Sequence, residues 1–346
     1  MSFEKSIIIV FFVSQIYEVF YVRRNFALEN MKLFLLNFYH DEALASNSPF
    51  YYPCKIARDL SEQLYDLPKF WNDSPAVYYK QGIKTDWSTI HEIEVWGWDL
   101  LVCHRLRQIG APESLLRTQE AIDNIRTLSS RQTAVTLLRE LRTPLADITF
   151  GESAFCRTTD EVQNYVKNYE SVLYKAPWSC SGRGVFSSGL DRVRKIIREQ
   201  GGIAVEPFFA HDQDFAMEFY CRADAVVYEG LSVFRTDAAG HYLGNLLDDQ
   251  ARLQAHLNVA PEHLTLVRKQ LEKALGKLLI GKYIGPVGVD MMVARQKIHP
   301  CVEINLRNTM GRCALYIYKA KPRPGFFSLL NKNGQIFPSI TPISSK

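Results

Sequence analysis

The chain alternates between short apolar runs and polar segments, and the period of this alternation changes along the sequence. Period-two alternation predicts the three strands of an antiparallel meander, at residues 215–221, 225–234 and 242–247. Helical spacing is clearest at residues 261–279, where one stripe carries Leu264, Val267, Leu271, Leu275 and Leu278. Helices and strands in mixed order therefore predict an α+β or α/β fold.

The first thirty residues differ from the rest of the chain. The segment has two apolar runs, at residues 6–13 and 16–22. Gln15 lies between them and Glu18 interrupts the second, and both runs are too short to predict a membrane span. The segment also lacks the small-residue cleavage motif that is typical of a signal peptide. We expect residues 1–30 to be an N-terminal extension that takes no part in the fold.

Residues 31–125 are expected to form a small α/β domain. The pattern predicts strands at residues 31–37 and 76–80, and helices at residues 56–64 and 100–109. Gly110 follows the second of these helices and is expected to end it. A further helix is predicted at residues 129–141, and Thr143-Pro144 stops it.

Three oxygen-bearing side chains lie on two predicted neighbouring strands. Asp290 ends the apolar run 284–289, whereas Glu303 and Asn305 lie two positions apart on the next strand and share a face. A polar turn at residues 294–297 would make the strands antiparallel neighbours. Carboxylate and amide oxygens favour Mg²⁺, with Mn²⁺ as the alternative ion, and substrate phosphates usually complete the shell.

A simpler interpretation of this segment stays open. Glu303 could form an ordinary surface ion pair with Arg307, four positions later. Short motifs occur by chance often enough that the segment alone does not decide between the two.

A lysine and a loop of small residues precede the meander. The predicted strand 171–177 carries Lys175, and the loop that follows contains Ser181, Gly182 and Gly184. Small residues allow backbone N–H groups to approach phosphate oxygens, and Lys175 adds a positive charge. An ordinary glycine turn between this strand and a helix at residues 190–200 is the alternative.

The strand at residues 203–209 runs into a proline, where the chain turns or becomes an edge. Backbone groups beside Glu206 and Phe208 could face a purine there, and Asp214 could accept hydrogen bonds from ribose hydroxyls. Asp212, two positions earlier, is a second candidate for that position.

Taken in order, these segments resemble the ATP-grasp superfamily over residues 126–315, and the Glu-x-Asn pair after an earlier Asp is the specific part. The resemblance implies an ATP-grasp fold in which two α+β subdomains clamp ATP, at about residues 126–204 and 205–320. It also implies that residues 31–125 form a small pre-ATP-grasp-like α/β domain. Residues 321–346 are expected to be a C-terminal tail, mostly loop, with a short strand near residues 325–330.

The resemblance also implies roles for individual residues. Lys175 would contact the phosphates or the adenine, Ser181, Gly182 and Gly184 would belong to a lid, and Glu206 and Phe208 would lie at the adenine. Asp214 would lie at the ribose, and Asp290, Glu303 and Asn305 would hold Mg²⁺. Arg131 occupies the place of an earlier lysine of the family; arginine keeps the positive charge but has a different reach.

Composition narrows the class of protein. The chain has 346 residues and a net charge of only +4, with no block of basic residues, so a nucleic-acid partner is not expected. No membrane association is expected either. Seven cysteines occur singly, without metal-ligand spacing, which favours a reducing compartment and therefore a cytoplasmic protein.

The function that this set favours is an ATP-dependent ligase that joins a small-molecule or peptide carboxylate to an amine or similar nucleophile through an acyl phosphate. Arg307 and Lys175 are the candidate catalytic residues, and Arg183 and Arg235 are weaker candidates for contacting substrate. A kinase on the same scaffold is the first alternative. A nucleotide-binding module without chemistry is the second, although the presence of all three metal-ligand residues disfavours it.

Overall fold

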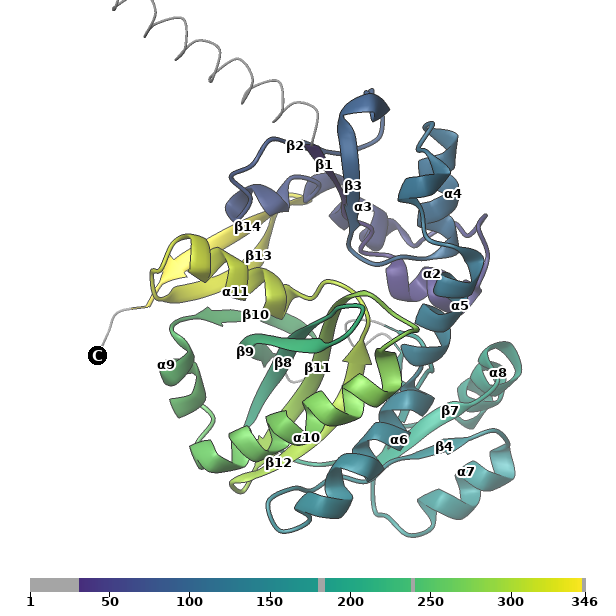
Figure 1. The fold of residues 1–346 in the computed structure, drawn as a ribbon. Helices are drawn as coiled ribbons and strands as arrows, with labels where there is room; N and C mark the ends of the chain where they lie inside the picture. Colours follow the sequence, from purple (N-terminus) through teal and green to yellow (C-terminus); the bar gives the residue numbers. More distant parts are fainter. Residues whose placement is uncertain (1–30, 180–183, 238–239, 344–346) are drawn as a thin grey trace, which may run out of the picture.

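The computed structural model describes residues 31–179, 184–237 and 240–343. The strands among these residues form three sheets (Figure 1). The expected extension at residues 1–30 lies outside the described residues. None of the helices in the described part of the chain combines the length and the apolar character that crossing a bilayer requires.

The N-terminal sheet has three parallel strands in the order β2-β1-β3. Its elements are β1 (Met31–Leu35), β2 (Ala76–Tyr78), β3 (Ile90–Val95), α2 (His40–Ser46), α3 (Lys55–Gln63), α4 (Leu100–Gln108) and α5 (Gln119–Leu128). Leu33 and Ile93 from the strands and Val102 and Leu106 from α4 form its core. The predicted strands and both predicted helices of this region are confirmed, with small shifts in their ends.

A second, four-stranded sheet has the order β4-β7-β5-β6 and is antiparallel throughout. Its elements are β4 (Ala154–Cys156), α7 (Thr159–Val166), β5 (Val172–Lys175), β6 (Val185–Phe186), α8 (Leu190–Gln200) and β7 (Ile203–Pro207). Val162 from α7 and Val193 from α8 pack on Ile203 and Val205 of β7. Before it in the chain, α6 (Arg131–Arg142) confirms the predicted helix and contacts both this sheet and the large one.

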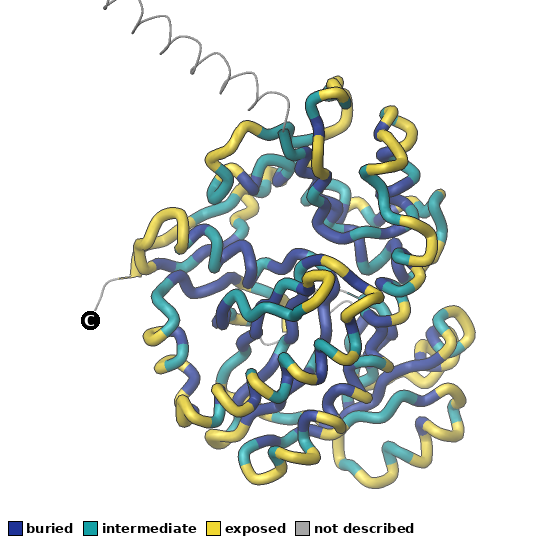
Figure 2. Tube along the Cα trace, viewed as in Figure 1, coloured by how far each residue is buried: buried dark blue, intermediate teal, exposed yellow. Residues whose placement is uncertain are grey.

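The large sheet has seven antiparallel strands in the order β12-β11-β8-β9-β10-β13-β14. Its elements are β8 (Gln213–Cys221), β9 (Val226–Thr236), β10 (Tyr242–Leu247), α9 (Gln250–Ala255), α10 (Pro261–Leu279), β11 (Gly285–Ala294), β12 (Lys297–Asn305), α11 (Met310–Ala320), β13 (Gly325–Lys332) and β14 (Gln335–Pro342). The meander β8–β10 and the long helix α10 are confirmed. α10 lies across one face of the sheet, and Val267 and Leu271 pack there with Phe215 and Phe219 in the main core (Figures 1 and 2).

The predicted short strand near residues 325–330 is confirmed as part of β13, but the expectation that the rest of the C-terminal segment is mostly loop is wrong. β13 and β14 are two eight-residue strands that extend the large sheet, and Phe327 is fully buried where β13 pairs with β10. A two-residue turn joins them at Asn333-Gly334, where both residues have positive φ. An Asn-Gly pair between alternating strands is a strong hairpin signal, which the sequence analysis passed over.

Candidate active site

Two adjacent strands bring the three predicted metal ligands together. Asp290 on β11 lies directly opposite Glu303 on β12. Asn305 lies opposite Gly288, two residues further along the pair of strands. Opposed residues of an antiparallel pair point to the same face. Asn305 donates a hydrogen bond from Nδ2 to Oδ2 of Asp290 at 3.2 Å, and only 5% of Asn305 is exposed. The side chains therefore form one cluster.

The cluster carries more negative than positive charge. Burial, followed by the nearby Glu303 carboxylate, raises the pKa of Asp290 well above its usual range, while Arg307 and the hydrogen bond from Asn305 act in the opposite direction. Two carboxylates and an amide in one partly buried cluster supply hard oxygen donors and a deficit of positive charge. That combination fits Mg²⁺ or Mn²⁺.

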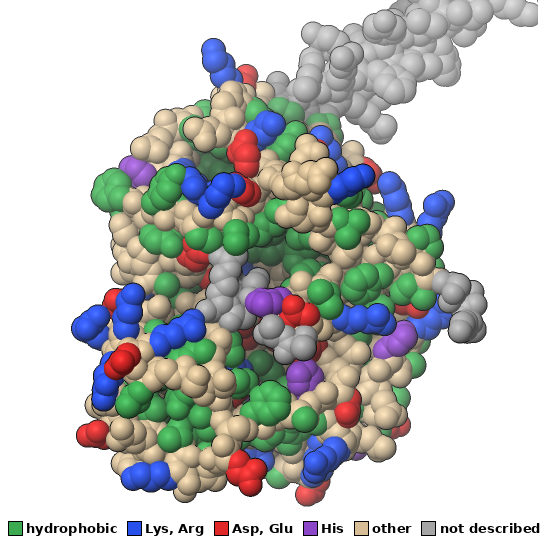
Figure 3. All heavy atoms as spheres, turned by 180° about the vertical axis from the view of Figure 1, so that it is seen from behind, with side chains coloured by type: hydrophobic (Ala, Val, Ile, Leu, Met, Phe, Trp, Pro, Cys, Tyr) green, Lys and Arg blue, Asp and Glu red, His purple; other side chains and the backbone are tan. Residues whose placement is uncertain are grey.

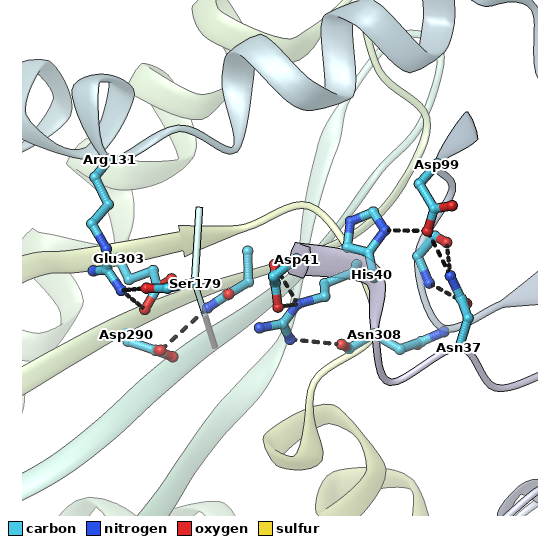
Figure 4. Close-up of polar contacts among 12 residues, drawn as sticks. Asn37, His40, Asp41, Asp99, Arg131, Ser179, Asp290, Glu303 and Asn308 are labelled. Carbon is cyan, nitrogen blue, oxygen red and sulfur yellow. Dashed lines mark hydrogen bonds and ion pairs between the residues drawn. The ribbon is translucent and has the colours of Figure 1, made fainter. Parts of the chain in front are cut away.

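Arg131 joins the cluster from α6. Its Nη2 lies 3.1 Å from Oε2 of Glu303 and 3.4 Å from Oγ of Ser179, and its Nε donates to the backbone oxygen of Ala176 at 3.0 Å (Figure 4). The side chain is buried, at 5% exposure. Arg131 therefore connects the start of α6, the loop after β5 and β12, the strand that carries Glu303.

The simpler interpretation of Glu303 is wrong. Glu303 pairs with Arg131, whereas Arg307 pairs with Asp41, with Nε of Arg307 at 3.1 and 3.3 Å from the two carboxylate oxygens. Both members of the second pair are largely buried, each side chain being 13% exposed. Neither contact is an ordinary surface ion pair.

Lys175 and Glu206 form a second polar pair between neighbouring strands of the small sheet. Lys175 on β5 and Glu206 on β7 make an ion pair, and each is 5% exposed. Together with Arg131 they line a narrow space of about 10 Å³ against Cys301 and Val302 of β12. Two residues that sequence reasoning assigned to one nucleotide are thus in contact with each other.

The ribose candidates are separated by their contacts. Asp214 on β8 accepts a hydrogen bond from Oγ1 of Thr236 at 2.8 Å and lies 3.0 Å from Nε2 of His211. Asp212 instead accepts a hydrogen bond from the backbone N–H of Arg295 at 2.9 Å, in the turn between β11 and β12. The side chain of Asp212 therefore contacts that turn. Asp214 lies on β8 and stays the candidate for the ribose. Phe208 follows β7 and is 57% exposed.

The loop of small residues is described only at its two ends. Ser181, Gly182 and Arg183 lie outside the described residues. Gly184 accepts a hydrogen bond from the N–H of Ala176 at 2.9 Å. A Cβ atom at Gly184 would lie 2.3 Å from Cβ of Ser179, so a glycine is needed where the two ends of the loop meet.

Arg235 does not join the cluster. Its neighbours Phe234 and Thr236 line the cavity of about 280 Å³ that is described below. The alternation of β9 turns Arg235 to the opposite face. There it is exposed, with its guanidinium 5.5 Å from the ring centroid of Phe326. Arg235 therefore lies away from the cavity, and its contact with substrate stays a prediction.

A cavity of about 280 Å³ adjoins the cluster. It is lined by Asp290, Glu303, Asn305 and Arg307, and by residues of the N-terminal sheet region and of β8 to β10. Seen from behind, the molecule is hollowed near the centre of its face, and Lys and Arg side chains lie scattered toward the edges rather than in one stripe (Figure 3).

Sequence reasoning missed Glu218, which lies at this cavity. It is fully buried and accepts hydrogen bonds from Oγ of Ser232 at 3.1 Å and from Oγ1 of Thr309 at 2.9 Å. Burial, and then the Asp290 carboxylate, raise the pKa of Glu218 to about 8. A Cβ atom at Gly311 would lie 2.2 Å from its Oε1. Glu218 lies four positions from Asp214 in an alternating strand, so shared parity was the available signal.

Comparison with known proteins supports one conclusion about the fold. No family model matches the sequence, and no curated protein matches it. A putative ATP-grasp superfamily protein from Archaeoglobus fulgidus matches with a TM-score of 0.51 and 12% identity, over 91% of this chain and 100% of that chain. This likeness shows that the chain has the ATP-grasp fold that the sequence resemblance predicted.

Two other similar structures have lower TM-scores. N5-carboxyaminoimidazole synthetase from Staphylococcus aureus, complexed with ADP, gives 0.49 at 10% identity, over 87% of this chain and 82% of that chain. The biotin carboxylase domain of 2-oxoglutarate carboxylase from Hydrogenobacter thermophilus gives 0.46 at 12% identity. That match covers 66% of this chain and 53% of the carboxylase chain, so the chain spans about half the length of that protein.

Proposed function

We propose that this chain, which has the ATP-grasp fold, is an ATP- and Mg²⁺-dependent ligase that joins a carboxylate to an amine or similar nucleophile. The observation that carries the proposal is the cluster of Asp290, Glu303 and Asn305 on β11 and β12. Arg307 lines the same cavity, so a guanidinium for a substrate carboxylate lies beside the donors for a metal–phosphate complex.

The proposed nucleotide site extends from this cluster toward the small sheet. Asp290, Glu303 and Asn305 hold Mg²⁺, or Mn²⁺ in its place, and the ion neutralises charge on the phosphates of ATP when bound. Lys175 and Arg131 bind phosphate oxygens, exchanging their present carboxylate partners for the nucleotide. Both side chains are already buried and directed by neighbouring contacts, which limits the entropy lost on binding.

The remaining nucleotide contacts are proposed from position and resemblance. Glu206 and Phe208 at the end of β7 bind the adenine, and Asp214 accepts hydrogen bonds from the ribose. Ser181, Gly182 and Gly184 cover the phosphates; the first two lie outside the described residues, so their assignment rests on the sequence. Arg183 stays a candidate for contacting substrate on the same basis.

The proposed reaction has two steps. An oxygen of the substrate carboxylate, oriented by Arg307, attacks the γ-phosphorus while the bond to the β,γ-bridging oxygen breaks and ADP leaves. The amine nitrogen then attacks the acyl phosphate carbon, phosphate leaves, and the proton lost from nitrogen passes to solvent. In such a transfer the protein mainly positions groups and neutralises charge.

Domain limits and compartment are also part of the proposal. We assign residues 31–125 to an N-terminal domain and residues 126–320 to the catalytic domain, divided near residue 204. The β13–β14 hairpin continues the sheet of the second subdomain. Six cysteines among the described residues are free and five of these are buried, which supports a reducing, cytoplasmic compartment.

Hydroxylamine trapping tests the reaction class. With ATP, Mg²⁺ and a carboxylic acid, hydroxylamine should yield a hydroxamate, because an acyl phosphate reacts with it. A parallel reaction supplies a hydroxy compound in place of the acid; ADP release with a stable phosphate ester of that compound, and no hydroxamate from any acid, would establish the kinase instead. Neither product, together with intact nucleotide binding, would indicate a binding module.

Glu303→Gln tests the metal assignment in the same assay. We expect turnover to fall roughly 10³-fold, because several kcal/mol of charge stabilisation depend on the metal. Glu272→Gln, on the outer side of α10 where Glu272 lies near Arg268, is the matched control and should keep full activity. Wild-type turnover in Glu303→Gln would remove the metal assignment.

A further inference from the structure

The cavity beside the metal cluster has an apolar side that the proposed chemistry does not use. It is formed by Phe38, Leu60, Trp96, Met310 and Leu329, here called the apolar wall. The wall draws on the N-terminal region, on α11 and on β13. Its residues pack with a core cluster around Leu36 and Phe327, and the rings of Phe38 and Trp96 lie 4.4 Å apart between centroids. A preformed apolar surface therefore faces the acidic cluster.

An ion pair of opposite charges lines the same cavity as the wall and the cluster. Asp41, in the first turn of α2, pairs with Arg307, and both residues line the cavity. The two segments are 266 positions apart in the chain. One place in the cavity thus offers an anion and a cation side by side, and Figure 4 shows Asp41 in contact with a guanidinium.

A buried network fixes the helix that carries Asp41. Nδ2 of Asn37 donates to Oδ2 of Asp99 at 2.8 Å and to the oxygen of Gly97 at 2.7 Å, and Nδ1 of His40 lies 3.2 Å from the same Oδ2 (Figure 4). Oδ1 of Asp99 accepts the N–H of Val102 at the start of α4. All three side chains of the network are at most 1% exposed. Asp41 is therefore held at the carboxyl edge of parallel β1 and β3, where α/β sheets bind ligands.

Charge decides which small molecule suits this place. A substrate with only a carboxylate would bring that anion to Arg307 and leave it close to Asp41, in a cavity that already contains Asp290 and Glu303. Like charges this close cost free energy. A substrate that also carries an ammonium group would offset the charge of Asp41, so a zwitterion complements the pair better than a simple acid.

We infer that the cavity binds a free amino acid with an apolar side chain as the acid that is activated. Its carboxylate lies at Arg307, its ammonium group at Asp41 and its side chain against the apolar wall. The volume of about 280 Å³ is just below the range of roughly 300–1,000 Å³ typical of drug-sized ligands, and so suits a molecule of amino-acid size. This inference rests on the proposed ligase function and names its substrate class.

Matched pairs of acids test the inference. The hydroxamate assay is run with L- and D-leucine and L- and D-phenylalanine, and with 4-methylpentanoate and 3-phenylpropanoate, which lack only the amino group. We expect kcat/KM for at least one amino acid to exceed that for its amine-free partner by about 10- to 100-fold, the effect of one charge-assisted hydrogen bond. Glutamate should react at least tenfold less well than leucine, because the wall is apolar.

Asp41→Asn identifies the residue that recognises the amine. We expect its kcat/KM for the amino acid to fall while that for the amine-free acid holds or rises, so that their ratio approaches one. A role limited to orienting Arg307 would lower both and leave the ratio unchanged. Asp59→Asn, in an exposed pair with Lys55 on α3, is the matched control and should keep the wild-type ratio.

The possible outcomes separate the inference from the proposed function. Hydroxamate from the amine-free acids at equal or higher kcat/KM would overturn the inference and keep the ligase. An unchanged ratio in Asp41→Asn would overturn the assignment of the ammonium to Asp41. Calorimetry with MgADP reports the nucleotide site separately. Binding of MgADP without hydroxamate from any of these acids overturns the substrate class alone, and absence of binding overturns both.

Discussion

Two polar pairs in this molecule, one buried and one partly buried, differ in how their charges are balanced. Lys175 and Glu206 place a cation against an anion across neighbouring strands of the small sheet. Asp290 and Glu303 place two anions directly opposite each other across β11 and β12. Like charges opposed in an antiparallel pair are destabilising. The first pair is balanced, whereas the second opposes two like charges, which is why the proposed metal site is assigned to the second pair.

Glu303 has a partial compensation in its ion pair with Arg131, and Asp290 has one in the charge of Arg307 and the hydrogen bond from Asn305. The raised pKa of Asp290 has burial and Glu303 as its leading causes. The fully buried Glu218 adds a third carboxylate to the same side. The acidic side of the site therefore keeps an unfavourable arrangement that local rules disfavour, as functional sites often do.

The largest expected effect comes from removing the unbalanced charge. Asp290→Asn should lower turnover roughly 10³-fold, because the metal loses a carboxylate ligand. In the absence of metal, the free energy of unfolding should stay the same or rise by up to about 1 kcal/mol, because a like-charge pair is gone. Steady-state ADP release and denaturant unfolding with and without Mg²⁺ measure both.

The metal dependence of stability is the sharper part of that test. A ligand that binds only the folded state stabilises it in proportion to its occupancy, so Mg²⁺ with ADP should raise the stability of the wild type and not of Asp290→Asn. A variant that is several kcal/mol less stable without metal would break the comparison. It would mean that Asp290 has a structural partner in the free protein.

The balanced pair predicts the opposite response. Lys175→Ala leaves Glu206 buried without its cation, and we expect a loss of roughly 3–5 kcal/mol in the free energy of unfolding. Nucleotide affinity should fall as well. The double variant Lys175→Met with Glu206→Leu should recover much of the stability but none of the affinity, because no buried charge is left. Unchanged ATP binding by calorimetry would exclude Lys175 from the phosphates.

The comparison also explains what could be predicted from the sequence. Asp290, Glu303 and Asn305 lie on consecutive strands joined by a short turn, so period-two alternation was enough to place them together. The same holds for the meander β8–β10. Wherever a contact is local and the strands are adjacent in the chain, alternation and turn residues determine which side chains face each other.

Contacts between distant segments could not be predicted in this way. Arg131 meets Glu303 across 172 positions, and Asp41 meets Arg307 across 266. These contacts depend on how the sheets pack, and periodicity carries no information about that. The helix α2, which carries Asp41, was not predicted from the sequence either. The placement of Arg235, in contrast, could have been predicted. Strict alternation in β9 puts it on the face opposite to its neighbours Phe234 and Thr236, which line the cavity.

The smallest expected effect concerns a pair that is balanced but half-exposed. Nε2 of His211 lies 3.0 Å from Asp214, and the hydrogen bond to that carboxylate is the leading cause that raises the pKa of His211. Burial opposes the shift, and Asp212 and the oxygen of Phe209 add to it. Because the folded pKa is raised, the stabilisation is fully present below the unfolded histidine pKa of about 6.5 and is lost as pH rises through the folded value.

His211→Asn should therefore destabilise the chain more at pH 5.5 than at pH 8.5, by less than about 1 kcal/mol, since a third of the side chain is exposed and solvent screens the pair. Urea unfolding at the two pH values measures the difference, and Asp214→Asn, which removes the leading cause of the raised pKa, should strongly reduce it. If ribose takes the Asp214 carboxylate, saturating ADP should also reduce the pH dependence. An undiminished pH dependence in Asp214→Asn would mean that another group holds the proton. The pair of His211 and Asp214 would then no longer support the ranking of the charged pairs by how their charges are balanced and buried.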